Sequence, residues 1–154
     1  MVYLVTGRIN SGKTTKMKQL HDEFQGDGFI AVKSMDRSTV VKFEAYRLST
    51  NETMLLAMSK TYYKGEFPIV CEIGPYVFNL HAIEWIEKTI DILIQNGIHP
   101  LFLDEVGMLE INDQCFSPII KRMLLSHLDC YFSLREDLLV PFVEHFYITD
   151  FQVI

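Results

Sequence analysis

Residues 7–14 read Gly-Arg-Ile-Asn-Ser-Gly-Lys-Thr, which matches the pattern G-x-x-x-x-G-K-[ST] at every fixed position. Glycines at these positions permit a tight loop whose backbone N–H groups point inward and cradle phosphate oxygens. The helix that follows adds its positive N-terminal end. Lys13 of the pattern is placed to reach the β- and γ-phosphates, and the Thr14 hydroxyl is a ligand for Mg²⁺. The stretch therefore predicts a loop that binds the phosphates of a nucleotide.

The residues on either side of this loop fit the same interpretation. Val2–Thr6 is an apolar run that predicts a buried strand, and Lys13–Phe24 has apolar residues at helical spacing. A phosphate loop needs a strand before it and a helix after it, whereas a glycine-rich turn with a solvated lysine, the alternative, does not. Arg8 is at a variable position, so we expect its side chain in solvent. The nucleotide-binding residues are predicted to be Gly7, Arg8, Ile9, Asn10, Ser11, Gly12, Lys13, Thr14 and Thr15.

Short apolar runs alternate with helical patterns along the rest of the chain, which is typical of a parallel sheet with crossover helices. We expect further strands at Phe29–Lys33, Thr39–Leu48, Pro68–Ile73, Leu101–Asp104, Cys130–Leu134 and Tyr147–Ile154. Helices are expected at His81–Gln95, Phe116–Leu125 and Leu138–His145. No repeat or linker-like tract divides the sequence, so residues 1–154 are predicted to form a single domain. The predicted fold class is α/β, a P-loop NTPase fold with a mostly parallel central sheet, helices on both faces and three layers.

Two carboxylates follow the apolar strand predicted at Leu101–Asp104. Ligands of parallel sheets lie beyond the carboxyl ends of the strands, so Asp104 is expected to hold Mg²⁺ beside Thr14. Glu105 is a candidate for orienting or deprotonating the attacking water. An acidic turn without function is the alternative. The long separation of Lys13 and Asp104 leaves room for another strand between theirs, which by fold analogy is more typical of hydrolysing P-loop ATPases than of kinases.

Arg135 follows the predicted strand Cys130–Leu134, so its side chain is expected at the same edge of the sheet as the phosphates. A guanidinium at that edge can meet γ-phosphate oxygens and stabilise the charge that develops during transfer. The alternative is local, because Glu136 and Asp137 come next and an ion pair with them would be worth about 0–1 kcal/mol. The sequence leaves both roles open.

Composition narrows the class of protein. The formal net charge of −6 argues against a protein that binds nucleic acid with its whole surface, and 49% apolar with 22% charged residues is ordinary for a globular domain. No uncharged apolar run approaches the roughly 18 residues that a membrane span needs, and the first residues resemble a strand rather than a signal peptide. Three distant cysteines, Cys71, Cys115 and Cys130, predict inert thiols in a reducing compartment. We therefore expect a cytoplasmic protein with no membrane partner.

Several stretches together resemble the THEP1-type nucleoside-triphosphatases. They are residues 7–15, Asp104-Glu-Val-Gly-Met-Leu-Glu110, Phe132-Ser-Leu-Arg-Glu136 and Gly74-Pro-Tyr-Val-Phe-Asn79. The chain departs from the family pattern at Ile9-Asn10 and around Asp36-Arg37. The resemblance implies a small RecA-like P-loop protein that uses Mg²⁺ to hydrolyse nucleoside triphosphates, ATP and GTP among others, to diphosphate and phosphate, with loose base selectivity. It also implies an arginine at the strand end occupied by Arg135.

Together, the residues and the resemblance predict a nucleoside-triphosphatase with Lys13, Glu105 and Arg135 as catalytic residues and Thr14 and Asp104 as metal ligands. A small nucleotide or nucleoside kinase would use the same loop, but such kinases usually carry several arginines in a lid, and the five arginines here are not clustered. A nucleotide-binding switch that does not hydrolyse its ligand is a third possibility. The sequence names no protein partner.

Overall fold

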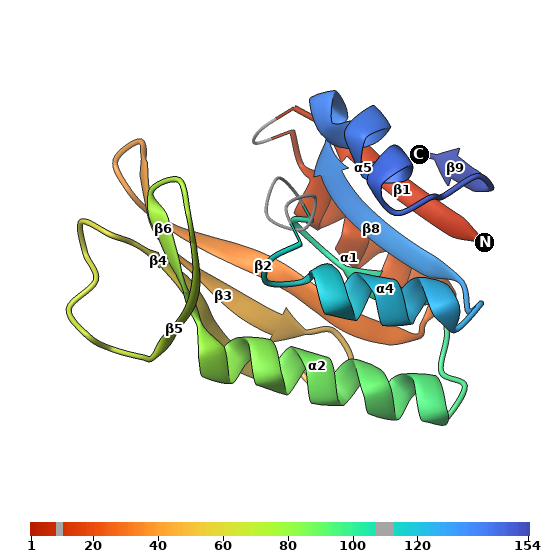
Figure 1. The fold of residues 1–154 in the computed structure, drawn as a ribbon, viewed down its shortest axis with the longest axis horizontal. Helices are drawn as coiled ribbons and strands as arrows, with labels where there is room; N and C mark the ends of the chain where they lie inside the picture. Colours follow the sequence, from red (N-terminus) through yellow and green to blue (C-terminus); the bar gives the residue numbers. More distant parts are fainter. Residues whose placement is uncertain (9–10, 107–112) are drawn as a thin grey trace.

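The computed structural model of the chain describes residues 1–8, 11–106 and 113–154. Its strands are β1 (Val2–Gly7), β2 (Asp27–Asp36), β3 (Thr39–Arg47), β4 (Thr53–Ser59), β5 (Ile69–Ile73), β6 (Tyr76–Asn79), β7 (Leu101–Leu103), β8 (Cys130–Arg135) and β9 (Phe151–Val153). The helices are α1 (Lys13–Phe24), α2 (Leu80–Gln95), α4 (Ser117–Leu125), α5 (Leu139–His145) and a 3₁₀ turn at Glu136–Leu138. Figure 1 shows how they are arranged.

All these strands belong to one sheet with the order β5-β6-β4-β3-β2-β7-β8-β1-β9. The strands from β2 to β9 in this order pair in parallel. From β2 to β5 every pairing is antiparallel, and these strands form the side of the molecule drawn on the left of Figure 1. The α/β fold is confirmed, and β8 is the extra strand expected between β1 and the acidic strand β7. The size of the antiparallel part, with β4 and β6 in it, was not expected.

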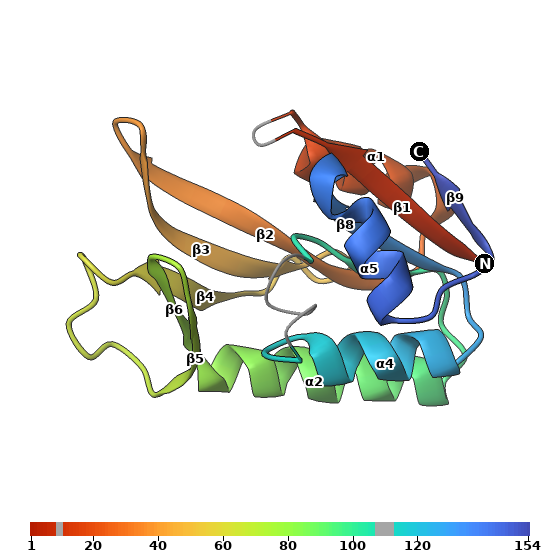
Figure 2. The same cartoon turned by 45° about the horizontal axis from the view of Figure 1, so that its top comes forward.

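Helices cover both faces of the sheet, which confirms the predicted three layers (Figure 2). On one face, Met17 and Leu20 of α1 are buried with Ile30 and Phe102 of the sheet. The opposite face is larger and packs against α2, α4 and α5, with Phe142 of α5 fully buried. The phosphate loop therefore joins β1, the strand next to the edge strand β9, to the single helix that the described residues place on the smaller face.

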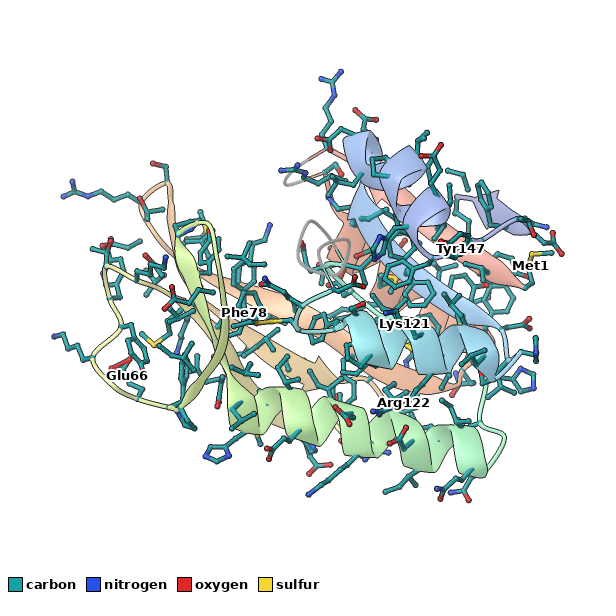
Figure 3. All side chains as sticks on the ribbon, in the orientation of Figure 1. Met1, Glu66, Phe78, Lys121, Arg122 and Tyr147 are labelled. Atoms are coloured by element: carbon teal, nitrogen blue, oxygen red, sulfur yellow. A yellow bond between two sulfur atoms is a disulfide. The ribbon has the colours of Figure 1, made fainter. Side chains whose placement is uncertain are left out.

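The longest helix, α2, is stabilised by a buried apolar stripe and by a side-chain cap at its N-terminus. Its isoleucine stripe is buried, and the Asn79 side chain caps the N-terminus by accepting a hydrogen bond from the His81 N–H. Arg122 of α4 donates to Glu87 at 2.7 Å and pairs with Asp91 at 3.1 Å, which holds α4 beside α2 (Figure 3). Among the described residues, no helix is long and apolar enough to cross a membrane.

A buried carboxylate fixes the start of β2. Asp27 is 3% exposed and accepts hydrogen bonds from the Arg47 guanidinium (2.8 Å), the Ser49 hydroxyl (2.6 Å), the Ser49 N–H and the Gly28 N–H. Burial alone would raise the pKa of Asp27, but these hydrogen bonds together hold it below its usual value. The network ties β2, which carries part of the candidate site, to the end of β3.

We expect Asp27→Asn to lower the free energy of unfolding at pH 7 by about 2–4 kcal/mol, because an amide cannot accept all these bonds and leaves Arg47 without its anion. The pKa of Asp27 is lower in the folded than in the unfolded protein, where it is near 4, so the ionised carboxylate stabilises the fold at pH values above about 4. This stabilisation is lost as the pH falls through the pKa of the folded state. Urea unfolding of wild type and variant from pH 7 to pH 2.5 should therefore show a difference that shrinks in acid. Asp22→Asn, on the exposed side of α1, is the control. A difference that grows in acid would contradict this account.

The cysteine prediction is wrong for two of the three residues. Cys71 of β5 and Cys115 before α4 are joined by a disulfide, with their Cα atoms 6.2 Å apart. They are 44 residues apart in the sequence, so only the fold brings them together and no spacing pattern could indicate the bond. Cys130 is free and buried, and burial raises the pKa of its thiol to about 12. It matches the predicted inert thiol.

Candidate active site

The phosphate loop connects the end of β1 to the start of α1. A Cβ atom at Gly7 would overlap the Ser11 side chain, and Gly12 has a φ of 90°, which disfavours residues with a side chain. The Ser11 N–H donates to the Arg8 carbonyl at 3.1 Å and closes the turn. The backbone conformation therefore favours glycine at position 12, and Gly7 leaves room for the Ser11 side chain. Ile9 and Asn10, also predicted to bind nucleotide, lie outside the described residues.

Lys13 is the first residue of α1 and is 7% exposed. Its ammonium folds back over the loop and donates to the Arg8 carbonyl at 2.8 Å. The positive charge therefore stands over the loop, at the N-terminal end of a helix, where a phosphate group would meet both.

Asp104 joins four elements of the site. It is 2% exposed, and its carboxylate accepts hydrogen bonds from Thr14 Oγ1 of α1 (2.7 Å), the Ala31 N–H of β2 (3.0 Å) and the Ser133 hydroxyl of β8. The structure thus brings together Thr14 and Asp104, the two predicted metal ligands, although they are 90 residues apart in the sequence. A hydroxyl and a carboxylate at this distance are the kinds of oxygen donor that Mg²⁺ binds.

Glu105 turns sharply away from the strand. Its φ is 60°, a left-handed conformation that costs a non-glycine residue about 1–3 kcal/mol and is concentrated at functional sites. Its N–H donates to the Ser133 hydroxyl at 2.8 Å, and Lys33 Nζ lies 3.9 Å from its carboxylate. Burial, followed by the charge of Asp104, raises the pKa of Glu105, against the opposing charges of Lys33, Lys13 and Arg135. A raised pKa makes the carboxylate a stronger proton acceptor.

Ser133 is a site residue that we did not predict. It is fully buried in β8, and its hydroxyl connects Asp104 to the backbone of Glu105. The Ser133 carbonyl also accepts from the Val106 N–H at 3.0 Å. One serine thus positions both acidic residues. A polar residue inside the otherwise apolar run Cys130–Leu134 was the signal that could have indicated it.

We expect Ser133→Ala to reduce kcat by about tenfold or more, because Asp104 and Glu105 lose the group that orients them. The unfolding free energy should also fall by about 1–3 kcal/mol, since buried polar atoms lose a partner. Steady-state phosphate release and urea unfolding measure the two effects. Ser59→Ala, another buried serine in β4, should alter stability alone. If Ser133→Ala keeps the wild-type kcat, Ser133 has no positioning role.

Lys13, Thr14 and Glu105 line one hollow of about 320 Å³. Its lining residues are Ser11, Gly12, Lys13, Thr14, Thr15, Lys18, Ala31, Val32, Lys33 and Glu105. The phosphate loop and Glu105 were predicted, whereas the contribution of β2 and of Lys18 was not. The hollow combines three lysines with one carboxylate, a charge pattern suited to an anionic ligand such as a phosphate chain.

The two arginines near the loop both have acidic partners. The Arg8 side chain is 88% exposed, as expected, and lies 3.4 Å from Glu136. Arg135 is paired in register with Gly7, the first residue of the phosphate loop, so it lies at the expected edge of the sheet. Its guanidinium donates to Asp137 at 3.1 and 3.2 Å, which is the local ion pair that the sequence also allowed. A phosphate role for Arg135 therefore stays a prediction.

The chain is similar to proteins of known families and structures. The nucleoside-triphosphatases THEP1 of Thermotoga maritima and Thermotoga sp. strain RQ2 are each 25% identical to it over 146 residues, which is 94% of this chain and 79% of theirs. The crystal structure of THEP1 from Aquifex aeolicus superposes with a TM-score of 0.70 at 16% identity and covers 100% of this chain and 88% of that one. The solution structure of a human cancer-related nucleoside triphosphatase superposes with a TM-score of 0.63 at 20% identity and covers 99% of this chain and 86% of that one.

The two structural matches support the α/β fold, and the sequence matches confirm the resemblance to the THEP1-type proteins. The sequence model of the family described as NTPase matches residues 2–154, which include the phosphate loop, the acidic strand end and Arg135. The chain therefore belongs to the NTPase family.

Proposed function

We propose that this protein hydrolyses nucleoside triphosphates to nucleoside diphosphate and phosphate. The observation that supports the proposal is that Lys13, Thr14 and Glu105 line one hollow and that the buried Asp104 is hydrogen-bonded to Thr14, although these residues come from two segments far apart in the chain. Membership of the NTPase family supports it. We further propose that residues 1–154, which share a single sheet, act as one domain.

The residues at the strand end fit a magnesium ion. Thr14 Oγ1 and Asp104 supply hard oxygen donors, and the buried Asp104 keeps one oxygen on Ser133 while the other faces Thr14. We propose these two residues as the protein's contribution to Mg²⁺ binding. When bound there, the ion would neutralise charge on the β- and γ-phosphates.

The other residues of the site would bind the phosphates and transfer the proton. The loop N–H groups and Lys13 would bind the phosphates and hold the terminal one toward the acidic residues. Glu105 would then accept a proton from a water molecule while the water oxygen attacks the γ-phosphorus. The bond between the γ-phosphorus and the bridging oxygen breaks, and that oxygen leaves with the diphosphate. We propose that Arg135 exchanges Asp137 for phosphate oxygens during this step. The ion pair with Asp137 is exposed, so the exchange costs little.

Phosphate release from ATP, GTP, CTP and UTP, with Mg²⁺ and with excess chelator, tests the proposal. We expect magnesium-dependent release from all four without any acceptor, at rates within about tenfold of one another, because none of the described lining residues forms an enclosed base pocket. Phosphoryl transfer that requires an added nucleoside or nucleotide would show a kinase instead. Tight binding without turnover would show a switch.

A further inference from the structure

A second hollow adjoins the phosphate loop on the side away from the acidic residues. It has a volume of about 470 Å³, and its lining residues are Val5, Thr6, Ser11, Gly12, Lys13, Thr15, Lys16, Gln19 and Ile154. The residues that it shares with the hollow of Glu105 are Ser11, Gly12, Lys13 and Thr15. Both hollows therefore open beside the same loop, and the proposed reaction uses only the one that contains Glu105.

The sheet order places the two hollows on opposite sides of the loop. The loop follows β1, which has β8 and β7 on one side and β9 on the other (Figure 2). The hollow of Glu105 is bordered by residues 31–33 of β2, the strand beyond β7. The second hollow is bordered by Val5 and Thr6 of β1 and by Ile154, which follows β9. The second hollow therefore lies on the β9 side of the loop.

Helix α1 shows the same division between its two sides. The residues of this helix that are buried against the sheet are Lys13, Met17 and Leu20. At 3.6 residues per turn, Thr14 and Lys18 lie on one side of this buried stripe, and both line the hollow of Glu105. Lys16 and Gln19 lie on the other side, and both line the second hollow. The helix thus presents a different pair of polar side chains to each hollow.

Lys16 and Gln19 are available to bind a ligand. Both are exposed, and within the described part of the chain neither side chain has a hydrogen bond or an ion pair with another residue. Helix side chains lean toward the N-terminus of their helix, so these two lean toward the phosphate loop. The ammonium and the amide can both donate hydrogen bonds to hydroxyl groups. Since the described lining residues include no aromatic ring on which a base could stack, the hollow suits a sugar.

The direction of a bound triphosphate follows from the proposed reaction. Its γ-phosphate must face the hollow of Glu105, where the attacking water is activated, while the loop holds the α- and β-phosphates. The nucleoside is attached to the α-phosphate, at the other end of this chain, and therefore leaves the loop on the side away from Glu105. A third hollow beside the loop is less than half as large, about 220 Å³, and is lined by Gly7 and by the two ion pairs of Arg8 and Arg135. The second hollow is thus the larger space for the nucleoside.

We infer that the second hollow binds the nucleoside of the substrate, and that Lys16 and Gln19 donate hydrogen bonds to its ribose hydroxyls. The inference rests on the proposed function and adds a site for the part of the substrate that the phosphate loop does not contact. All four ribonucleoside triphosphates carry the same sugar, so contacts with the sugar agree with the proposed loose base selectivity. The competing explanation is a surface groove between α1 and β9 whose lysine and glutamine are merely solvated.

Calorimetric titration of the double variant Lys16→Ala/Gln19→Ala with Mg²⁺ and either β,γ-imido-ATP or diimidotriphosphate tests the inference. Diimidotriphosphate has the same chain of phosphates but no nucleoside. We expect the affinity for β,γ-imido-ATP to fall about tenfold, because two hydrogen bonds are lost, and that for diimidotriphosphate to stay within about twofold of wild type. Lys88→Ala/Gln95→Ala removes the same groups from exposed positions of α2 and should bind both ligands as wild type does. Equal losses for both ligands, or no loss for either, would overturn the inference.

A comparison of ADP with 2′,3′-dideoxy-ADP separates contact with the sugar from an indirect effect of the substitutions. We expect wild-type protein to bind ADP about tenfold more tightly than the dideoxy compound, and the double variant to bind the two alike. A preference for ADP that persists in the double variant would refute hydrogen bonding to the ribose. Wild-type protein that binds neither β,γ-imido-ATP nor diimidotriphosphate would overturn the proposed function together with the inference. Wild-type binding of β,γ-imido-ATP that the double variant retains in full would overturn the inference alone.

Discussion

Lys13→Ala is expected to lower kcat/KM for nucleoside-triphosphate hydrolysis by about 10²-fold or more, with the fold retained. The ammonium stands over the phosphate loop, 2.8 Å from the Arg8 carbonyl, and is shielded from water. A triphosphate concentrates its negative charge at the same place, and a desolvated cation stabilises developing charge more than an exposed one does. Among the described residues, the hydrogen bond of the Lys13 ammonium goes to the loop itself, at the Arg8 carbonyl, so stability should change little.

Steady-state kinetics and calorimetric binding of β,γ-imido-ATP measure the effect, and thermal unfolding shows whether the variant is folded. Lys88→Ala removes the same charge from the exposed side of α2 and should behave as wild type. If folded Lys13→Ala protein binds and hydrolyses nucleotide normally, the interpretation of residues 7–14 as a phosphate loop is wrong.

The parallel part of the fold could be predicted because its signals are local. The phosphate pattern fixes both a strand end and a helix start, and α1 begins and ends at Lys13 and Phe24 as expected. A helix as long as α2 shows its apolar period over several turns, and a buried parallel strand such as β7 is a continuous apolar run. Each of these elements can be identified without knowing its neighbours.

The antiparallel part could not be predicted in the same way. β4 reads Thr-Met-Leu-Leu-Ala-Met-Ser, in which leucine, methionine and alanine favour helices and no polar residue alternates with them. It is a strand because β3 and β6 pair with its two edges. β6 has only four residues between the turn at Gly74 and the start of α2, too few for a period to show. Tertiary pairing outweighs local propensity in both strands.

Some residues of the candidate site could also be predicted from local sequence patterns, and others could not. The phosphate loop and the acidic pair are contiguous motifs, and sequence patterns indicate such residues. Ser133 and Lys33 come beside the acidic pair because β8 and β2 flank β7 in the sheet and not in the sequence. The sequence can mark Ser133 as an unusual polar residue in an apolar run, but only the strand order shows which residues it meets.

Glu105→Gln is expected to slow hydrolysis by about 10²-fold or more while Mg–nucleotide binding stays near normal. The amide has the shape of the carboxylate, so the left-handed turn and the hydrogen bond from its N–H to Ser133 should persist. It cannot take the proton of the attacking water, and burial gives the native carboxylate a raised pKa that suits this task. Binding does not need that proton transfer, which is why only kcat should fall.

Asp104→Asn provides the contrast, because the two acidic residues are adjacent in sequence but have different contacts. Asp104 faces Thr14 Oγ1 at 2.7 Å and is buried, whereas Glu105 lines the hollow. The Asp104 variant should therefore require more Mg²⁺ for half-maximal activity, and the Glu105 variant should keep the wild-type magnesium dependence at its lower rate. Phosphate release measured across a magnesium titration separates the two. Should Glu105→Gln hydrolyse at the wild-type rate, another group activates the water, and the left-handed turn at Glu105 serves the backbone alone.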